Sequence, residues 1–530
     1  MSKQQLDVLI IGAGLSGIGM ACHLTRECPD KRYAILEGRD AIGGTWDLFR
    51  YPGIRSDSDM FTLGYSFRPW TSDKAIADGP SIRQYINDTA DEYGVRKHIH
   101  FNHRVLRSNW NSAEGLWEVT AEHEGKSTTF SARFVVNCTG YYRYEAGYTP
   151  EFPGRDSFKG QIVHPQLWPE DLDYQGKKVI IIGSGATAVT LVPALAQGGA
   201  DVTMLQRSPS YVASVPESDH ISIALRKFLP ESVVYRLARA RNVGLQMAVY
   251  RLSKMQPKLM RKLLMKQVEL QVGKEFDMTH FDPKYNPWDE RLCAVPNGDL
   301  FKVLRKGQAQ IVTDHIETFN ENGILLKSGQ QLDADIIITA TGLQVQILGG
   351  AELTLDDKPY DLLNAVAYKG LMFSDLPNAA MVFGYTNSSW TLKADISAEY
   401  VCRLLNYMEE IDKKVATPRT PAGLNTRPFI DMDSGYVQRA RALMPKQGDR
   451  APWQVSQTYA VDLASMRLSK IDDGAMEFSN PRPALKKAAP AQQDAAPAAA
   501  KKAPAKPRAK KAPAAKKAAA SKPNPADAPA

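Results

Sequence analysis

Two stretches of the chain show the same order of apolar and polar positions. Each begins with a short run in which nearly every residue is apolar, at 7–11 and again at 178–182. A glycine-rich turn and a helical stretch follow each run, and a second apolar run comes next, at 33–36 and at 201–205. Strands that are apolar on both faces and alternate with helices are typical of parallel sheets covered by helices. The pattern therefore predicts an α/β fold with two Rossmann-like dinucleotide-binding domains.

Four further stretches differ from these repeated units. Residues 98–140 alternate as in a small antiparallel sheet, and 335–342 is another buried strand, which ends in Ala-Thr-Gly. Residues 220–275 are predicted to form several helices, in which Lys and Arg are interleaved with Leu, Met, Val and Tyr. Residues 484–530 consist mainly of Ala, Pro and Lys without apolar periodicity, so we expect this tail to be disordered.

Charge is distributed unevenly along the chain. The 530 residues carry a formal net charge of +8, and the tail at 484–530 accounts for it with ten Lys, one Arg and two Asp. Residues 1–483 are therefore nearly neutral, and no specific nucleic-acid partner is expected. The tail would bind polyanions only weakly and in a salt-dependent way, and a solubilising appendage is the preferred interpretation.

Cysteine usage and hydropathy favour a cytoplasmic protein. The five cysteines form no C-x-x-C pair, no secretory signal is evident, and no metal site is predicted. No apolar run reaches the roughly 18 residues that a membrane-spanning helix needs. The basic helices at 220–275 leave two interpretations, a cap over the core or a peripheral contact with a membrane, and the cap is preferred.

The first glycine-rich turn has the features of a dinucleotide site. Gly12, Gly14 and Gly17 follow the first strand directly, with Ser16 between them, and a helix comes next. Glycines at these places let the backbone approach a pyrophosphate, and the helix N-terminus directs free N–H groups at it. Glu37 ends the second strand, 20 positions after Gly17, where an acidic residue would hold ribose hydroxyls. A glycine-rich turn without a nucleotide is the less favoured alternative.

The second turn repeats the first with one difference. Its residues are Gly183, Ser184, Gly185, Ala186, Thr187 and Ala188. The strand after it is followed by Arg207 and Ser208 instead of an acidic residue, and an arginine can pair with a 2′-phosphate that a carboxylate would repel. We therefore predict FAD at the first site and NADPH at the second. The expected domains are an FAD-binding domain at 1–150 and 335–482, an NADPH-binding domain at 158–334 with a helical insertion at about 220–275, and the tail at 484–530.

The connector between the two turns carries a family resemblance. Phe158, Gly160, His164 and Trp168 fit the pattern F-x-G-x-x-x-H-x-x-x-W. This pattern resembles the signature of the class B flavoprotein Baeyer–Villiger monooxygenases, and the resemblance extends over about 5–482. It implies an enzyme that uses FAD, NADPH and O2 to insert one oxygen atom into ketones, through a C4a-peroxyflavin, giving esters or lactones. Sulfur compounds such as thioethers or thioamides are implied as further substrates.

The resemblance also implies which residues meet the cofactors. The segment at 43–57 resembles the flavin-contacting segment of the family. The implied FAD contacts are Thr45, Trp46, Asp47, Leu48, Asp57 and, through its backbone, Val105. Arg55, Ser56 and Asp57 are implied to meet the nicotinamide cofactor. From the residues alone, Arg55 and Asp57 could instead form a surface ion pair. Val105 could likewise be an ordinary core valine.

Two residues are the implied catalytic pair. Arg291 falls where the family carries a catalytic arginine, and its guanidinium would hold a permanent positive charge beside a reacting anion. Asp57 would orient Arg291. Many relatives have Lys-Arg at this place, whereas this chain has Glu290-Arg291, so Arg207 and Ser208 are expected to hold the NADPH phosphate without that lysine.

Three alternatives remain open at this point. A flavin-containing monooxygenase that acts mainly on nitrogen or sulfur atoms shares the same motifs. A pyridine-nucleotide disulfide reductase also has two nucleotide units, but it needs a C-x-x-C, which this sequence lacks. A non-enzymatic role would rest on the tail alone.

Overall fold

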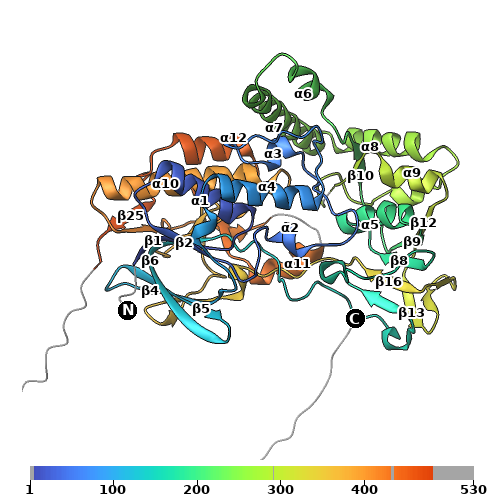
Figure 1. Cartoon of the computed structure of the whole chain (residues 1–530), viewed down its shortest axis with the longest axis horizontal. Coiled ribbons are helices and arrows are strands. Elements are labelled where there is room, and N and C mark those ends of the chain that lie inside the picture. Colours follow the sequence, from blue (N-terminus) through green and yellow to red (C-terminus); the bar gives the residue numbers. More distant parts are fainter. Residues whose placement is uncertain (1–4, 291, 431–434, 482–530) are drawn as a thin grey trace, which may run out of the picture. The chain divides into compact units, whose positions relative to one another are not determined.

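Two sheets form the framework of the protein (Figure 1). The computed structural model describes residues 5–290, 292–430 and 435–481. In that part of the chain the first sheet has nine strands and the second has five, and helices pack against both. The α/β architecture with two Rossmann-like units, predicted from the repeated apolar runs, is confirmed. The tail lies outside the described residues.

The first sheet is built around β1 (Leu6–Ile11), which runs parallel to its neighbours β2 and β6. The strand order is β18-β17-β4-β5-β6-β1-β2-β3, and β21 also pairs with β6. The bounds are β2 (Tyr33–Leu36), β3 (Ile99–His100), β4 (Arg104–Asn111), β5 (Leu116–His123), β6 (Lys126–Asn137), β17 (Glu352–Leu355), β18 (Lys358–Pro359) and β21 (Ala379–Met381). Strands β4, β5 and β6 are antiparallel, as the alternation at 98–140 predicts.

The second sheet is parallel throughout, in the order β12-β9-β8-β16-β7. Its strands are β7 (Gln161–Val163), β8 (Lys178–Ile182), β9 (Asp201–Gln206), β12 (Ala309–Thr313) and β16 (Ile336–Thr339). The sequence interpretation assigned β16 to the FAD-binding segment, but the strand pairs with β7 and β8 in this sheet. A strand that is apolar on both faces fits the interior of either sheet, so its composition does not select one.

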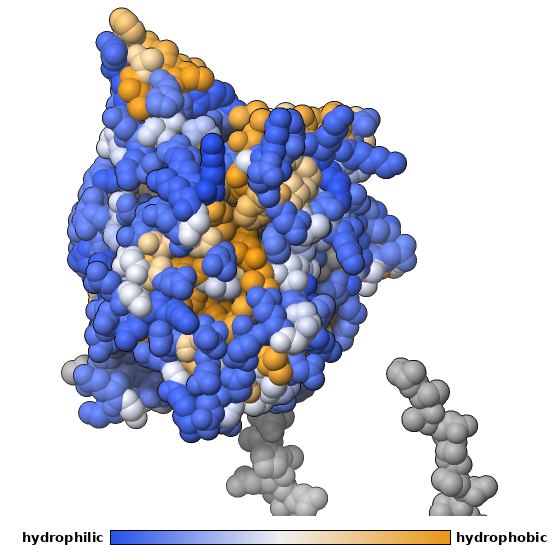
Figure 2. Space-filling view, turned by 90° about the vertical axis from the view of Figure 1, so that its right-hand side faces the viewer, coloured by the Kyte–Doolittle hydropathy of each residue, from blue (hydrophilic) through white to orange (hydrophobic). Residues whose placement is uncertain are grey.

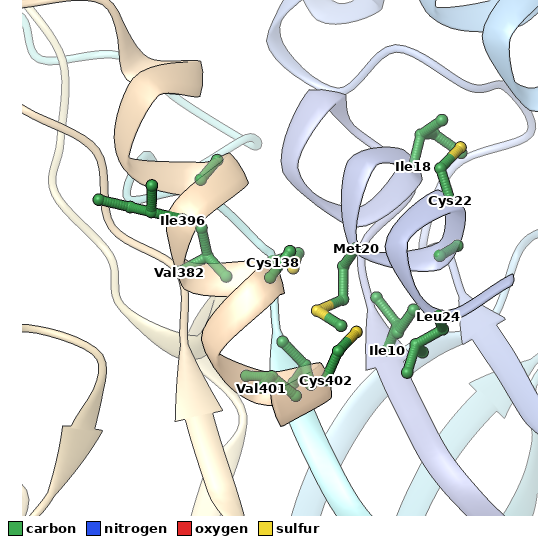
Figure 3. Close-up of a cluster of buried hydrophobic side chains, with 14 of the residues drawn as sticks. Ile10, Ile18, Met20, Cys22, Leu24, Cys138, Val382, Ile396, Val401 and Cys402 are labelled. Atoms are coloured by element: carbon green, nitrogen blue, oxygen red, sulfur yellow. The ribbon is translucent and has the colours of Figure 1, made fainter. Parts of the chain in front are cut away.

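Two helices from opposite ends of the chain share the core of the first unit. Helix α1 (Leu15–Glu27) packs against α10 (Trp390–Glu410). Figure 3 shows Met20 of α1 facing Val401 and Cys402 of α10, with Cys138 close by and Leu24 of α1 beside Ile10. These side chains are at most 5 % exposed, so the contact excludes water and holds the glycine turn of α1 against the sheet.

The helical insertion stands at the top of Figure 1. It consists of α6 (His220–Leu225), α7 (Glu231–Met255) and α8 (Pro257–Val272). The other helices near the two sheets are α2 (Thr45–Leu48), α3 (Met60–Leu63), α4 (Gly79–Glu92), α5 (Ala186–Gln197) and α9 (Asp299–Arg305). Within the described ranges, none of the helices combines the length and apolarity that crossing a bilayer requires.

Candidate active site

The first glycine turn forms a tight cradle at the carboxyl end of β1. A Cβ at Gly17 would lie 1.9 Å from the carbonyl oxygen of Gly12, and a Cβ at Gly12 would lie 2.7 Å from that of Cys138. Only glycine fits either place, and the φ of Gly12 is +102°. Helix α1 begins beyond Gly14 without a side-chain cap or an acidic residue in its first turn. Its first N–H groups therefore remain for an anion.

Glu37 stands beside this cradle at the end of β2. Its side chain is buried and accepts hydrogen bonds from the backbone N–H of Ala13 at 2.6 Å and of Arg39 at 2.9 Å. Burial raises the pKa of Glu37 above its ordinary value, and these two hydrogen bonds oppose the rise. The carboxylate is thus held in one orientation at the wall of a cavity, where it has lone pairs left to accept from hydroxyl groups.

The cavity has a volume of about 1250 Å³ and extends from the cradle to the helical insertion. Nine predicted site residues line it: Gly12, Gly14, Ser16, Glu37, Thr45, Trp46, Ser56, Asp57 and Val105. At the insertion its wall contains the apolar side chains of Ile221, Leu245 and Val249. The size exceeds the roughly 300–1000 Å³ of an ordinary small-molecule pocket, so a dinucleotide and a second molecule have room in it.

The segment at 45–48 lies partly behind the cavity wall. Asp47 is 1 % exposed and accepts from Arg39 at 2.6 Å, Arg50 at 3.0 Å and Arg83 at 3.0 Å. Burial alone would raise the pKa of Asp47, but the three guanidinium groups, Arg39 foremost, hold it below its ordinary value. Asp47, Leu48 and Gly17 are buried and are not among the described residues that line the cavity. Their contact with a flavin stays a prediction.

The segment after it connects the two units. Phe49, Tyr51 and Ile54 are buried in the core of the second unit, and a Cβ at Gly53 would lie 2.8 Å from Cβ of Ala194 in α5. Sequence reasoning placed this loop at the cofactors and missed its role in packing. The spaced aromatic and aliphatic residues of this loop indicate that it packs against something, but they do not identify the surface on which it packs.

Arg55, Ser56 and Asp57 have three different environments. The guanidinium of Arg55 forms a two-point ion pair with Asp299 at the start of α9. Ser56 is buried, and its hydroxyl accepts from the N–H of Ser58 at 2.9 Å. Asp57 is exposed on the cavity wall, so its carboxylate can reach a bound molecule.

The second glycine turn repeats the geometry of the first. Gly183 has a φ of +142°, and a Cβ there would lie 2.4 Å from the carbonyl oxygen of Ala340. This close approach corresponds to that of Gly12 to the carbonyl oxygen of Cys138 in the first turn. Helix α5 follows without a side-chain cap, and Gly185 and Ala186 at its start are exposed. Thr187 and Ala188 continue into the helix.

The phosphate-binding candidates lie at the same edge of the second sheet. Arg207 and Ser208 are exposed and directly follow β9, the neighbour of β8. The hydroxyl of Ser184 donates to the carbonyl oxygen of Ser208 at 3.0 Å, which ties the glycine turn to this loop. The structure therefore brings an uncapped helix start and an arginine together at an open surface.

The connector has a structural role and does not supply a general acid or base. The backbone N–H of Gln166 donates to Nδ1 of His164 at 3.2 Å, so the proton is on Nε2, which donates to the carbonyl oxygen of Gly342 at 3.2 Å. Burial lowers the pKa of His164, which keeps the ring neutral. The Nε2 bond holds the connector against the loop after β16, and the Nδ1 bond lies within the connector itself.

The sequence did not indicate that Tyr385, Lys393 and Asp462 form a hydrogen-bonded polar group near the cavity. The hydroxyl of Tyr385, which lines the cavity, donates to Asp462 at 2.7 Å, and Lys393 pairs with the same carboxylate at 2.9 Å. Lys393 is itself buried and lies below the cavity wall. Trp390 does line the cavity, and its Nε1 donates to the hydroxyl of Ser16 at 2.8 Å.

The catalytic candidate Arg291 lies outside the described residues. On either side of it, Trp288, Leu292 and Ala294 line the cavity. Asp59, Asn242 and Gln246 form a polar patch on the same wall, where Asn242 and Gln246 of α7 donate to the Asp59 carboxylate at 2.9 and 3.0 Å.

Comparison with known proteins is consistent with two nucleotide units. Residues 10–74 match a family described as NAD(P)-binding Rossmann-like domain, and 75–348 match the family described as flavin-binding monooxygenase-like. Among solved structures of similar fold, the OTEMO complex with FAD and NADP has a TM-score of 0.68 at 21% identity, covering 89% of this chain and 99% of that one. An open structure of cyclohexanone monooxygenase has a TM-score of 0.71 at 20% identity, covering 90% and 100%.

Relatives of much higher identity span nearly the same length. The chain is 54% identical to the probable FAD-binding monooxygenase AlmA of Acinetobacter baylyi, over 90% of this chain and 96% of that protein. It is 54% identical to the putative FAD-containing monooxygenase MymA of Mycobacterium tuberculosis, over 90% and 98%. It is 53% identical to the FAD-containing monooxygenase EthA of Mycolicibacterium smegmatis, over 91% and 99%. The chain therefore belongs to the flavin-binding monooxygenase-like family.

Proposed function

We propose that this protein is an FAD- and NADPH-dependent monooxygenase that inserts one oxygen atom of O2 into ketones, giving esters or lactones, and that also oxidises thioethers or thioamides. The observation that carries the proposal is the single cavity that joins the nucleotide cradle to an apolar wall. A flavin bound in the cradle and an apolar substrate at the insertion would share that cavity. The names of the close relatives as FAD-containing monooxygenases support the same reaction class.

The residues present fit FAD at the first unit. The cradle of Gly12 and Gly17 has no room for a side chain, and the uncapped start of α1 offers N–H groups to a pyrophosphate. Glu37 would accept from ribose hydroxyls, and Val105, Thr45 and Trp46 on the cavity wall would contact the rings. When bound and reduced by NADPH, the flavin supplies the activation of O2.

The second unit fits NADPH. The open helix start at 185–188 would receive its pyrophosphate, and Arg207 with Ser208 would bind the 2′-phosphate through charge-assisted hydrogen bonds. A guanidinium keeps its proton beside a phosphate, so the positive charge of Arg207 does not change with pH near neutrality.

Arg291 would act on the reacting atoms, and Asp57 would position Arg291. A guanidinium in a cavity from which substrate excludes water stabilises negative charge on an attacking oxygen and on the adduct it forms with a carbonyl. Asp57 on the cavity wall would orient that guanidinium. His164 takes no part, because its ring is neutral and both nitrogens are engaged.

The test is turnover by the purified protein. We expect a yellow, FAD-containing protein that consumes NADPH with linear, cyclic or aryl ketones and transfers one ¹⁸O atom from labelled O2 to the ester. A thioether in the same panel separates this activity from a monooxygenase that acts mainly on nitrogen or sulfur. Turnover of the thioether without any ketone turnover would assign the protein to that second class.

A further inference from the structure

Exposed apolar side chains are concentrated on the helical insertion. Of the sixteen large exposed apolar side chains in the described part of the chain, ten lie between 220 and 275. Figure 2 shows apolar surface at the top of the molecule, where the insertion stands, with hydrophilic side chains between the apolar ones. The sequence interpretation preferred a cap whose apolar residues face the core, whereas these residues face solvent. So large an unburied apolar surface indicates an interaction site.

Helix α8 carries two parallel rows on its exposed face. Leu259, Leu263 and Leu270 are 46, 52 and 69% exposed, and at about 100° per residue they fall within about 40° of one another around the helix. The exposed residues Lys258, Lys262 and Lys266 repeat every fourth position and form an adjoining row. A leucine row beside a lysine row is the arrangement of a helix that lies in a membrane interface.

Helix α7 has a similar apolar stripe. Leu237, Leu245, Leu252 and Met255 are 50, 61, 39 and 74% exposed and fall within about 80° around the helix. Exposed basic residues flank one side of the stripe, and these are Arg236, Arg251 and Lys254. The stripe runs through most of the 25 residues of the helix, so its length would lie along a surface.

The other side of the α7 stripe leads into the cavity. Leu245 and Val249 line the cavity and are 61 and 37% exposed, and Ile221 of α6 lines it and is 59% exposed. The apolar surface of the insertion is therefore continuous with the apolar wall of the cavity.

We propose that the exposed faces of α7 and α8 dock on the surface of an anionic lipid bilayer, with both helices along its plane. The leucines would enter the acyl boundary, and the lysine and arginine side chains would reach the acidic headgroups. A symmetric dimer through the same face would instead bring the lysine row of α8 close to its own copy, with repulsion between like charges. Charge complementarity therefore favours lipid over a second copy of this chain.

Docking in this orientation has a consequence that rests on the proposed function. The part of the cavity wall that α6 and α7 supply would lie next to the bilayer, so apolar substrates dissolved in lipid would enter along this apolar surface. Vesicle binding can be measured without turnover, so absence of the proposed reaction would not contradict lipid docking. Absence of vesicle binding would likewise not contradict the proposed reaction.

The test measures co-sedimentation of the full-length protein with vesicles of equal parts phosphatidylcholine and phosphatidylglycerol. The variant Leu259→Ser/Leu263→Ser/Leu270→Ser is expected to lose at least about tenfold in vesicle affinity. The matched control is Leu363→Ser/Leu443→Ser/Leu468→Ser, which changes three leucines of comparable exposure (47, 52 and 77%) outside the insertion and should bind as the parent does. The variant Lys258→Gln/Lys262→Gln/Lys266→Gln should also weaken binding by at least about tenfold at low salt.

The basic tail is present in all variants, so binding through the tail would be equal in all of them. Equal vesicle affinity of both leucine variants would overturn the proposal, as would a parent protein that binds no vesicles. A parent that forms a dimer in solution, lost in the Leu259 variant and without vesicle binding, would assign the surface to a second copy instead. Thermal melting of each variant checks that it is folded, and the lysine variant tests the proposal independently if the leucine variant is not.

Discussion

The guanidinium of Arg55 and the carboxylate of Asp299 form a two-point ion pair, with Nη1–Oδ2 at 2.5 Å and Nη2–Oδ1 at 3.3 Å. The two side chains are 15 and 21% exposed, and they join the loop after α2 to the first turn of α9. A pair with two parallel hydrogen bonds fixes direction as well as distance. This contact, together with Phe49 and Tyr51 in the core of the second unit, couples the two nucleotide units mechanically.

We expect Asp299→Asn to lower the free energy of unfolding by about 1 kcal/mol or more, because it leaves a partly buried guanidinium without its counter-ion. Urea unfolding followed by circular dichroism measures the change. The control Glu321→Gln removes the carboxylate that faces Lys159 at 4.0 Å, where both side chains are about 70% exposed, and should leave stability unchanged. An equal effect of both substitutions would contradict a coupling role for the Arg55 pair.

Arg207→Gln is expected to raise KM for NADPH about tenfold or more, because a neutral amide replaces a charged donor to the 2′-phosphate. NADH lacks that phosphate, so its KM should change little. Steady-state kinetics with both nucleotides give the ratio. Arg305→Gln, at an exposed arginine of α9, is the matched control. A parallel rise for NADH would show that Arg207 has no specific role toward the phosphate.

Arg291→Ala should reduce ketone conversion about 100-fold or more, because it removes the fixed positive charge at the reacting oxygen. Reduction of the flavin by NADPH should proceed at the parental rate, which stopped-flow absorbance can measure. Arg291→Lys keeps the charge but not the planar donor geometry, so its rate of ketone conversion should lie between those of the parent and the alanine variant. Ketone conversion by the alanine variant at the parental rate would exclude Arg291 from the reaction.

The stability of the protein should fall as pH rises from neutrality, through His23. Burial lowers the pKa of His23, but the nearby carboxylate of Asp395 and the hydrogen-bonded carboxylate of Glu27 outweigh it and raise the pKa to about 9. Glu27 lies 2.7 Å from Nδ1 and Asp395 lies 3.6 Å from Nε2, and Arg239 also pairs with Asp395. A histidine whose pKa is higher when folded than when unfolded contributes stability that is complete below about pH 6.5 and is lost as pH rises through about 9.

The measurement is the thermal midpoint of the parent and of His23→Gln at pH 6, 7.5 and 9.5. The difference between the two proteins should be largest at pH 6 and should shrink toward pH 9.5. Taking the difference removes the contribution of other titrating groups. A difference that is constant over this range would show that folding does not shift the pKa of His23.

Much of the framework could be predicted from local sequence. The strand, glycine turn and helix at 7–26 recur at 178–196, and the structure has both units, since tight turns at Gly12 and Gly183 require glycine whatever surrounds them. The helical insertion at 220–275 was also visible, because helical periodicity extends over many residues there. Nine of the predicted FAD and nicotinamide residues line the cavity, and three of them, Gly12, Gly14 and Ser16, belong to the first turn.

Other features depend on contacts between residues that are far apart in sequence, and only the tertiary structure decided these. Asp47 pairs with Arg83, Lys393 pairs with Asp462, and His164 bonds to Gly342, and none of these pairings follows from local spacing. Composition likewise did not assign the strand 336–339 to the second sheet or decide whether the leucines of 259–270 face the core or solvent. A periodic pattern defines a face of an element, but which surface covers that face depends on packing between parts of the chain that are far apart in sequence.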